Sequence, residues 1–372
     1  MKKLILILLI LFHVSVYAQN NQTKDDSFAA EIDSEIQQAE KKKEQTTNVQ
    51  DSSNRLDMAA VVDTVGFWQG NKESTALNRF FVREAALGIF NDIDHLARGT
   101  LRLNLETEDG IQYEPGVEEA YFEFLTLPYG LYAKVGKFLV DAGRLNTFHR
   151  HAWNFDSSPL VYETFFGEGI NEAGAEVSIL MPWSFYQELR IGIFNGDSIG
   201  SDAPSLKKSM PMMTARLKHF FPLGQRWGTQ FGFSFIRYAP DQDKRNYNLY
   251  YGADAMLKWK KNSLRSFSVT SEVWMKQAYR NHVLKKKNIG GYLALNWQFL
   301  QTWTVSVRQD VVNSFRLKTA DYETGLWLKW QPSGFAYYRI GATRHKPYQS
   351  LEEYTIRTQA DFVVGYHPAH KY

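Results

Sequence analysis

Residues 249–259 read LYYGADAMLKW, and apolar and polar side chains alternate along this stretch with a period of two. The side chains of one parity are apolar throughout: Leu249, Tyr251, Ala253, Ala255, Leu257 and Trp259. Asp254 and Lys258 have the opposite parity. A period of two places successive side chains on opposite faces of a β-strand, so this stretch predicts a strand with one apolar and one polar face.

The same alternation recurs from about residue 55 to the end of the chain. Further apolar sets of one parity are Leu101, Leu103 and Leu105; Ala120, Phe122 and Phe124; Phe231, Phe233 and Phe235; Leu293, Leu295 and Trp297; Val305 and Val307; Leu326, Leu328 and Trp330; and Ile356, Ala360, Phe362 and Val364. The stretch from Met58 to Phe67 alternates poorly but is counted as the first strand. No amphipathic helix is predicted beyond residue 55.

The connections between these strands alternate between short and long. The short ones carry turn residues, as in 127–130, 181–183, 222–225, 260–262, 300–301 and 332–334. The long ones are polar and cover roughly 68–79, 107–117, 139–170, 195–211, 239–246, 277–288, 312–321 and 345–353. Short periplasmic turns and longer outer loops are typical of transmembrane barrels. We therefore predict an all-β fold, a transmembrane antiparallel β-barrel of about sixteen strands with a long third outer loop and both termini periplasmic.

The N-terminal residues 1–18 have the pattern of a secretory signal peptide. Lys2 and Lys3 precede an apolar run over residues 4–12, and cleavage is expected after Ala18. The run is too short to span a bilayer.

Residues 19–54 are predicted to be a polar periplasmic tail, because they hold too few large apolar groups to form a core. Phe28, Ile32, Ile36 and Ala39 recur at helical spacing, so a short helix is expected there, with a coiled coil as the alternative. The barrel is assigned to residues 55–372.

Composition narrows the chemistry. The chain has no cysteine, which excludes disulfides, thiolate metal sites and a cysteine nucleophile. A formal net charge of +3 offers no case for nucleic-acid binding. A mean hydropathy of −0.39 fits a barrel whose strands average apolar and polar residues, and ten Trp and twenty Tyr suit interfacial girdles. A large secreted sandwich or solenoid is the alternative. No cofactor is predicted.

The third outer loop contains the motifs that relate the chain to a known family. Residues 136–138 read GKF, 143–146 read GRLN, 159–161 read PLV and 171–176 read NEAGAE. Over residues 55–372 the chain resembles the outer-membrane porin superfamily, nearest to the phosphate-selective porin O and P group. The resemblance implies a diffusion channel for small hydrophilic solutes or ions, with the third loop folded into the lumen. It also implies a homotrimer that is surrounded by the lipid and lipopolysaccharide of the outer membrane. Tyr372 at the C-terminus resembles the terminal aromatic signal that the outer-membrane assembly machinery recognises.

Charged and polar residues of this loop and of the strands are the candidate pore residues. The constriction is predicted to be lined by Arg144, Asn146, His149, Arg150, Asp156, Glu163 and Glu168. The facing wall is predicted to contain Arg102, Glu119, Glu123, Lys134, Glu176, Glu188, Arg190, Arg308, Arg357 and Asp361. Rings of charge in a narrow passage select ions by sign, but the two signs are nearly balanced here. The alternative is that these charges pair across neighbouring strands.

Two further clusters suggest ligands. His149 and His151, with Asp156 or Glu163, form a weak candidate for a divalent metal site, against the alternative of hydrogen bonds within the loop. Arg280, His282 and Lys285–Lys287 form a basic cluster in the sixth outer loop. This cluster is predicted either to contact lipopolysaccharide phosphates or draw in anions, or to be a solvated hairpin tip.

The sequence is also compared with the requirements of two other functional classes, barrel enzymes and structural or adhesive barrels. A barrel enzyme, chiefly a phospholipase or protease, needs a nucleophile, a base and an orienting group. The sequence has no H-E-x-x-H motif, and His219 has no evident serine partner, so an enzyme is not predicted. A structural or adhesive barrel would have a filled lumen.

Overall fold

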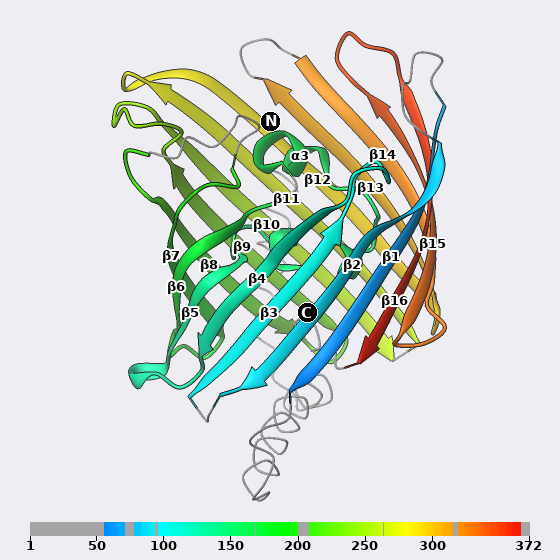
Figure 1. Cartoon of the computed structure of the whole chain (residues 1–372), viewed down its shortest axis with the longest axis horizontal. Coiled ribbons are helices and arrows are strands. Elements are labelled where there is room, and N and C mark those ends of the chain that lie inside the picture. Colours follow the sequence, from blue (N-terminus) through cyan, green and yellow to red (C-terminus); the bar gives the residue numbers. More distant parts are fainter. Residues whose placement is uncertain are drawn as a thin grey trace, which may run out of the picture.

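The computed structural model describes residues 56–70, 78–93, 96–167, 169–199, 208–262, 264–314 and 319–365. Within them a closed antiparallel barrel of sixteen strands forms, in which neighbours in sequence pair and β1 closes onto β16 (Figure 1). The strands are β1 (Asp57–Gln69), β2 (Arg79–Asp92), β3 (Ala97–Glu106), β4 (Glu114–Phe124), β5 (Leu131–Leu139), β6 (Asn171–Leu180), β7 (Tyr186–Phe194), β8 (Met212–Leu223), β9 (Trp227–Tyr238), β10 (Tyr247–Asn262), β11 (Arg265–Arg280), β12 (Val283–Leu300), β13 (Trp303–Ser314), β14 (Thr319–Trp330), β15 (Ala336–Lys346) and β16 (Glu353–Gly365). The predicted fold class is confirmed. The expected signal peptide, the polar tail, Glu168 and Tyr372 lie outside the described residues.

The alternation in sequence becomes an outer and an inner face. In β3 the outward side chains of Leu101 and Leu103 are 36% and 38% exposed, whereas the inward Thr100 and Arg102 are each 7% exposed. The poorly alternating first strand also belongs to the barrel, because Ala59 to Gln69 pair with Gly365 to Thr355 of β16. Closure pairs each of the sixteen strands with a neighbour on both sides, so no strand of the barrel has an open edge.

Aromatic rings gather on the outer face near the ends of the strands. Trp303 stacks on Trp330 with ring centroids 6.0 Å apart, Trp330 on Tyr338 at 5.4 Å, and Tyr338 meets Phe362 at 6.0 Å. Trp and Tyr favour the level of the lipid headgroups, so this row has the character of an interfacial girdle. Among the described residues no helix is long and apolar enough to cross a membrane.

The sixth of the long connections differs from the prediction. A long loop was expected over residues 277–288, but β11 and β12 continue as a hairpin whose turn is Asn281 and His282. Both residues have positive φ, 51° and 61°, as a tight two-residue hairpin turn requires. Lys285, Lys286 and Lys287 therefore lie on β12 and not in a loop.

Two local features of the third loop also escaped the sequence. The short helix α3 (Leu160–Phe166) follows Pro159, although no helix was expected beyond residue 55. Five of its seven residues are buried, so its apolar residues surround the axis and give no amphipathic period. Single-turn 3-10 segments are η2 (Pro128–Gly130), η3 (Leu145–Thr147) and η4 (Arg150–Ala152).

Candidate pore constriction

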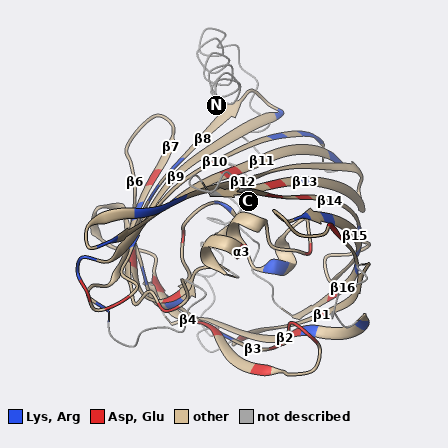
Figure 2. Cartoon of the chain, turned by 90° about the horizontal axis from the view of Figure 1, so that it is seen from above, with Lys and Arg blue, Asp and Glu red and all other residues tan. Residues whose placement is uncertain are grey.

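The connection between β5 and β6, residues 140–170, folds into the barrel; we call it loop 3. Viewed from above, α3 lies inside the ring of strands (Figure 2). Its Phe166 meets the inward ring of Trp274 on β11 at 4.9 Å, and Phe155 meets Trp327 on β14 at 5.8 Å. These rings belong to a buried apolar cluster that joins loop 3 to the wall. Loop 3 therefore occupies part of the lumen.

Glycines make room for the wall tryptophans in this cluster. A Cβ atom at Gly325 or Gly341 would lie 2.0 or 2.1 Å from the Trp327 indole. A Cβ atom at Gly252 would lie 2.7 Å from Trp274. The large rings lie flat against the wall because these neighbours lack side chains.

Asn146 ties the two ends of loop 3 together. Its amide nitrogen donates to the carbonyl oxygens of Val140 at 2.7 Å and Ile170 at 2.9 Å, and its amide oxygen accepts from the Ile170 nitrogen at 2.7 Å. Asn146 is 4% exposed. Asn146 was predicted to line the constriction, but its side chain forms these hydrogen bonds within the loop. It therefore holds the two ends of the loop together, a region we call the neck, and does not face an open passage.

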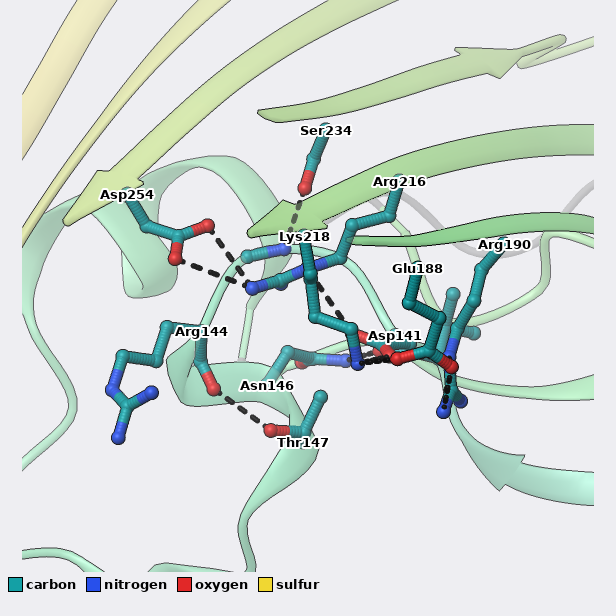
Figure 3. Close-up of polar contacts among 12 residues, drawn as sticks. Asp141, Arg144, Asn146, Thr147, Glu188, Arg190, Arg216, Lys218, Ser234 and Asp254 are labelled. Atoms are coloured by element: carbon teal, nitrogen blue, oxygen red, sulfur yellow. Dashed lines mark hydrogen bonds and ion pairs between the residues drawn. The ribbon is translucent and has the colours of Figure 1, made fainter. Parts of the chain in front are cut away.

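Asp141 joins the base of loop 3 to three cations of the wall (Figure 3). Its carboxylate lies 3.0 Å from Arg190, 3.3 Å from Arg216 and 2.8 Å from Lys218. Burial acts to raise the pKa of the Asp141 carboxyl, but Arg216, Lys218 and Arg190 outweigh it and hold that pKa well below its usual range. A charged Asp141 therefore anchors the loop.

The predicted wall residues Glu176, Glu188 and Arg190 belong to the same network. Arg190 lies 2.9 Å from Glu176 and 2.7 Å from Glu188, and Lys218 lies 3.0 Å from Glu188. All three residues point into the lumen, yet their charges neutralise one another across neighbouring strands. The pairing alternative therefore describes this part of the wall.

His149 docks loop 3 against β4. Its Nδ1 lies 2.8 Å from Glu118 and its Nε2 3.1 Å from Glu119. A β-bulge makes this possible: the register shifts between Arg102 and Leu103, so the extra residue Glu118 faces the lumen beside Glu119. Arg102 also pairs with Glu118. Sequence reasoning missed Glu118 because strict alternation puts it on the outer face.

The surroundings of His149 favour its charged form. Burial and Arg102 lower the pKa of His149, but the carboxylates of Glu118 and Glu119 outweigh them and raise it to about 9. The His151 ring stacks on His149 with centroids 5.6 Å apart. Because carboxylates engage both nitrogens of His149, the weak metal candidate has no ligand atom available on this ring. In the part of the chain that the structure describes, no group of three His, Cys, Asp or Glu side chains has the geometry of a metal site.

Three wall arginines hold the backbone of loop 3 on the opposite side; we call Arg83, Arg308 and Arg339 the carbonyl clamp. Arg83 donates to the Asp156 carbonyl at 3.1 Å, Arg308 to the Ser157 carbonyl at 2.6 Å, and Arg339 to the Trp153 carbonyl at 2.7 Å. Arg308 was predicted as a wall residue, whereas Arg83 and Arg339 were missed. A second β-bulge, between Asp63 and Thr64, turns Arg83 inward. The clamp uses these charges to fix the loop.

Asp156 reinforces the clamp. Its carboxylate accepts a hydrogen bond from the Trp327 indole nitrogen at 2.7 Å, and it is 3% exposed. It was predicted to line the constriction, but it is buried between the loop and the wall.

The remaining candidates have separate surroundings. Arg150 pairs with Glu108 at 3.1 Å, and Glu163 is exposed on α3. Lys134 lies 3.6 Å from the centre of the Tyr121 ring, and Arg357 lies 5.1 Å from that of Phe67.

The last two wall candidates are acidic. Glu123 accepts a hydrogen bond from the Tyr132 hydroxyl. Asp361 is 1% exposed and pairs in register with Asp63 across the closure of the barrel. The predicted set therefore does not form one ring; it is divided between several contacts of loop 3 and of the wall.

A cavity of about 330 Å³ remains between loop 3 and the wall formed by β10 to β14. Its lining includes Arg144 from the loop and Lys258 and Lys329 from the strands. Gln301 and Gln331, in the turns that follow β12 and β14, also line it. The cavity thus lies between loop 3 and the end of the barrel that carries the short turns.

Comparison with known proteins supports the architecture. No protein-family model matches the chain. A protein of Aquifex aeolicus (strain VF5), described as uncharacterized, is 28% identical over 296 residues, which cover 69% of this chain and 63% of that protein. The chain therefore spans less than two thirds of that relative.

Solved structures of outer-membrane proteins have a similar fold. The anion-selective porin from Comamonas acidovorans has a TM-score of 0.61 at 8% identity, covering 83% of this chain and 99% of that one. The outer membrane channel DcaP of Acinetobacter baumannii has a TM-score of 0.58 at 11% identity, with 85% and 99% covered. The trimer form of the outer membrane protein OmpT of Vibrio cholerae has a TM-score of 0.56 at 11% identity, with 83% and 99% covered. The chain has the fold of the outer-membrane porins.

Proposed function

We propose that the protein is a porin, a passive diffusion channel for small hydrophilic solutes in the outer membrane of a Gram-negative bacterium, with periplasmic termini. The observation that carries this proposal is the contrast between the two faces of the closed barrel. The outer face presents exposed Leu, Val, Ile and Phe side chains and aromatic rows, whereas the inner face holds the charged side chains. A cylinder that is apolar outside and charged inside suits lipid around it and water within it.

Loop 3 is the proposed constriction. Its neck, its Asp141 network, its His149 contact and the carbonyl clamp fix it inside the lumen at four places. The charges that fix the loop are already paired, so they set the shape of the passage more than its selectivity. The open edge of the loop, where Glu163 is exposed, contributes the charge that solutes meet.

Assembly and partners follow from the same proposal. OmpT is described in a trimer form, which supports a homotrimer for this chain. Lys285 and Lys286 are exposed near the start of β12, just after the hairpin turn at Asn281 and His282. Clustered cations at the outer rim suit the phosphates of lipopolysaccharide.

An enzymatic barrel has one feature in its favour that sequence reasoning missed. Residues 196–200 read GDSIG and match the G-x-S-x-G pattern of nucleophilic serines. The Ser198 hydroxyl, however, donates to Glu172 at 2.7 Å, a carboxylate that also accepts from the Gly196 nitrogen. His219 is flanked in register by Gln187 and Phe231, so neither directly opposite residue is a serine. These contacts favour a loop turn over a catalytic triad.

Reconstitution into planar lipid bilayers tests the pore. Stepwise conductance increments in potassium chloride, with liposome swelling by small sugars, are expected of an open channel. Absence of both would overturn the porin proposal and favour a structural or adhesive barrel.

Deletion of loop 3 tests the constriction. The Val140 nitrogen donates to the Ile170 carbonyl at 2.9 Å, so the loop ends are adjacent and a short Gly-Ser linker joins them. We expect the single-channel conductance to rise. The matched control replaces residues 240–245 of the loop between β9 and β10 with the same linker. Equal conductance in the loop 3 deletion and in the unaltered protein would refute the constriction.

A further inference from the structure

The cavity between loop 3 and the wall has a lining of one charge sign. Arg144, Lys258 and Lys329 line it, and no described residue of the lining is Asp or Glu. A low-dielectric wall concentrates the field of such charges within the space that they enclose. The cavity therefore attracts anions and repels cations.

Two carboxylates that act on Arg144, those of Asp254 and Glu272, are bound by other groups and do not line the cavity. Asp254 is held by Arg216 at 3.1 Å. Glu272 accepts from the Leu145 backbone nitrogen and from the Tyr162 hydroxyl, both at 2.7 Å. Both carboxylates therefore accept hydrogen bonds from neighbouring groups, and neither residue lines the cavity.

The strand side of the cavity is a surface of hydroxyl and amide groups. Ser266 and Ser268 on β11 and Asn296 and Gln298 on β12 line it, and Thr304 extends it onto β13. Ser266 donates to Gln298 at 3.1 Å, and the Asn296 amide nitrogen donates to Ser268 at 3.3 Å. The Asn296 amide oxygen is buried and has no hydrogen-bond partner among the described residues. A buried acceptor without a donor is an unsatisfied polar atom in the wall of the cavity.

The loop side of the cavity is aromatic. Phe148, Trp153 and Phe155 of loop 3 line it, with Tyr292 from β12 beside them. Aromatic faces pack against the C–H groups of a carbon chain or ring and cannot replace lost hydrogen bonds. A solute in the cavity thus meets hydrogen-bonding groups on one side and an apolar face on the other.

We propose that this cavity is a selectivity compartment for hydroxylated organic anions, with a carboxylate drawn by the three cations and hydroxyls bound along β11 and β12. A volume of about 330 Å³ stands at the lower end of ligand cavities, roughly 300–1,000 Å³, which fits a solute of about six carbons. The inference rests on the proposed function as a pore, because solutes reach the compartment through the lumen.

The test compares ions that share one six-carbon polyhydroxyl chain. The full chain is reconstituted in planar bilayers, and the reversal potential is measured across a gradient of N-methylglucamine gluconate. The two ions share the polyhydroxyl chain and differ in the charged end group, a carboxylate in one and a methylammonium group in the other. We expect gluconate to permeate at least tenfold better than N-methylglucamine. Gluconate is also expected to block the chloride current more strongly than hexanoate, which has the same chain length and no hydroxyl groups.

Variants assign the effect to the cavity. A unit charge about 6 Å away in water changes the local population of each ion about threefold, in opposite directions for anions and cations. The double variant Lys258→Gln and Lys329→Gln should therefore lower the permeability ratio by about tenfold or more. Lys244→Gln, at an exposed position in the loop between β9 and β10, is the matched control and should leave the ratio unchanged. Asn296→Leu should remove the preference for gluconate over hexanoate as a blocker.

The outcomes separate the two proposals. No current in potassium chloride overturns the pore itself. A current with no preference for gluconate, or a preference that the double lysine variant leaves intact, overturns the compartment and leaves the pore standing. Equal block by gluconate and hexanoate overturns the role of the hydroxyl-binding surface.

Discussion

The contact of His149 with β4 predicts that loop 3 loosens at alkaline pH. The pKa of His149 is raised from 6.5 to about 9, because the carboxylates of Glu118 and Glu119 outweigh burial and Arg102. A shift of this size corresponds to about 3 kcal/mol in favour of the docked loop. The His149 side chain is 13% exposed, so solvent screens this contact little.

The sign follows from the direction of the shift. A group whose pKa is raised in the docked state contributes its full stabilisation below 6.5, the value in the undocked loop, and loses it as the pH rises through about 9. At pH 6 the loop is held by a charged imidazole between two carboxylates. Above pH 9 the imidazole is neutral and Glu118 and Glu119 repel each other, with Arg102 and Lys134 as cations that still act on them.

Single-channel recording between pH 6 and pH 10 measures this effect. We expect quiet openings at pH 6 to 7 and frequent transitions between conductance levels above about pH 9. His149→Gln should show these transitions over the whole range, because glutamine has no charge to lose. His282→Gln, in the exposed β11–β12 turn, controls for the loss of a histidine elsewhere. Identical pH profiles for the unaltered protein and His149→Gln would refute the reasoning.

Three substitutions test the other attachments of loop 3, each followed by urea unfolding in lipid vesicles. Asn146→Ala removes three hydrogen bonds at the neck and should cost about 2–4 kcal/mol; a loss under about 0.5 kcal/mol would contradict its role. Asp141→Asn leaves Arg190, Arg216 and Lys218 with one carboxylate fewer and should cost about 3–5 kcal/mol, with a shift of reversal potential toward anions; an unchanged reversal potential would show that the network does not act on permeating ions. Trp327→Phe keeps an aromatic ring, although a smaller one, and loses the donor to Asp156, at a cost of about 1–3 kcal/mol; a neutral effect would show that another donor replaces it.

The sequence predicted the barrel well because every strand has to solve the same local problem. A side chain at Leu101 or Leu103 faces the outer surface and one at Arg102 the lumen, and a period of two records that choice in the residues themselves. The turn at Asn281 and His282 was missed, because this pair lacks the glycine that commonly marks a two-residue hairpin.

The candidate site was predicted only in part. The long third loop and its charges were recognised, but the roles of Asn146 and Asp156 depend on contacts with residues that strand alternation does not relate to them. Glu118 and Arg83 face the lumen only because β-bulges interrupt the alternation, and no motif announces these bulges.

What the sequence by itself determined is the class of the fold: sixteen strands, their inner and outer faces, and the position of the long loop between β5 and β6. What only the tertiary structure decided is how that loop crosses the lumen, which charges it neutralises, and which cavity it leaves against β10 to β14. The physical reason is the range of the interactions. Strand faces are set by neighbours two residues apart, whereas the contact of Asp156 with Trp327 joins residues 171 positions apart, and only closure of the barrel brings them together.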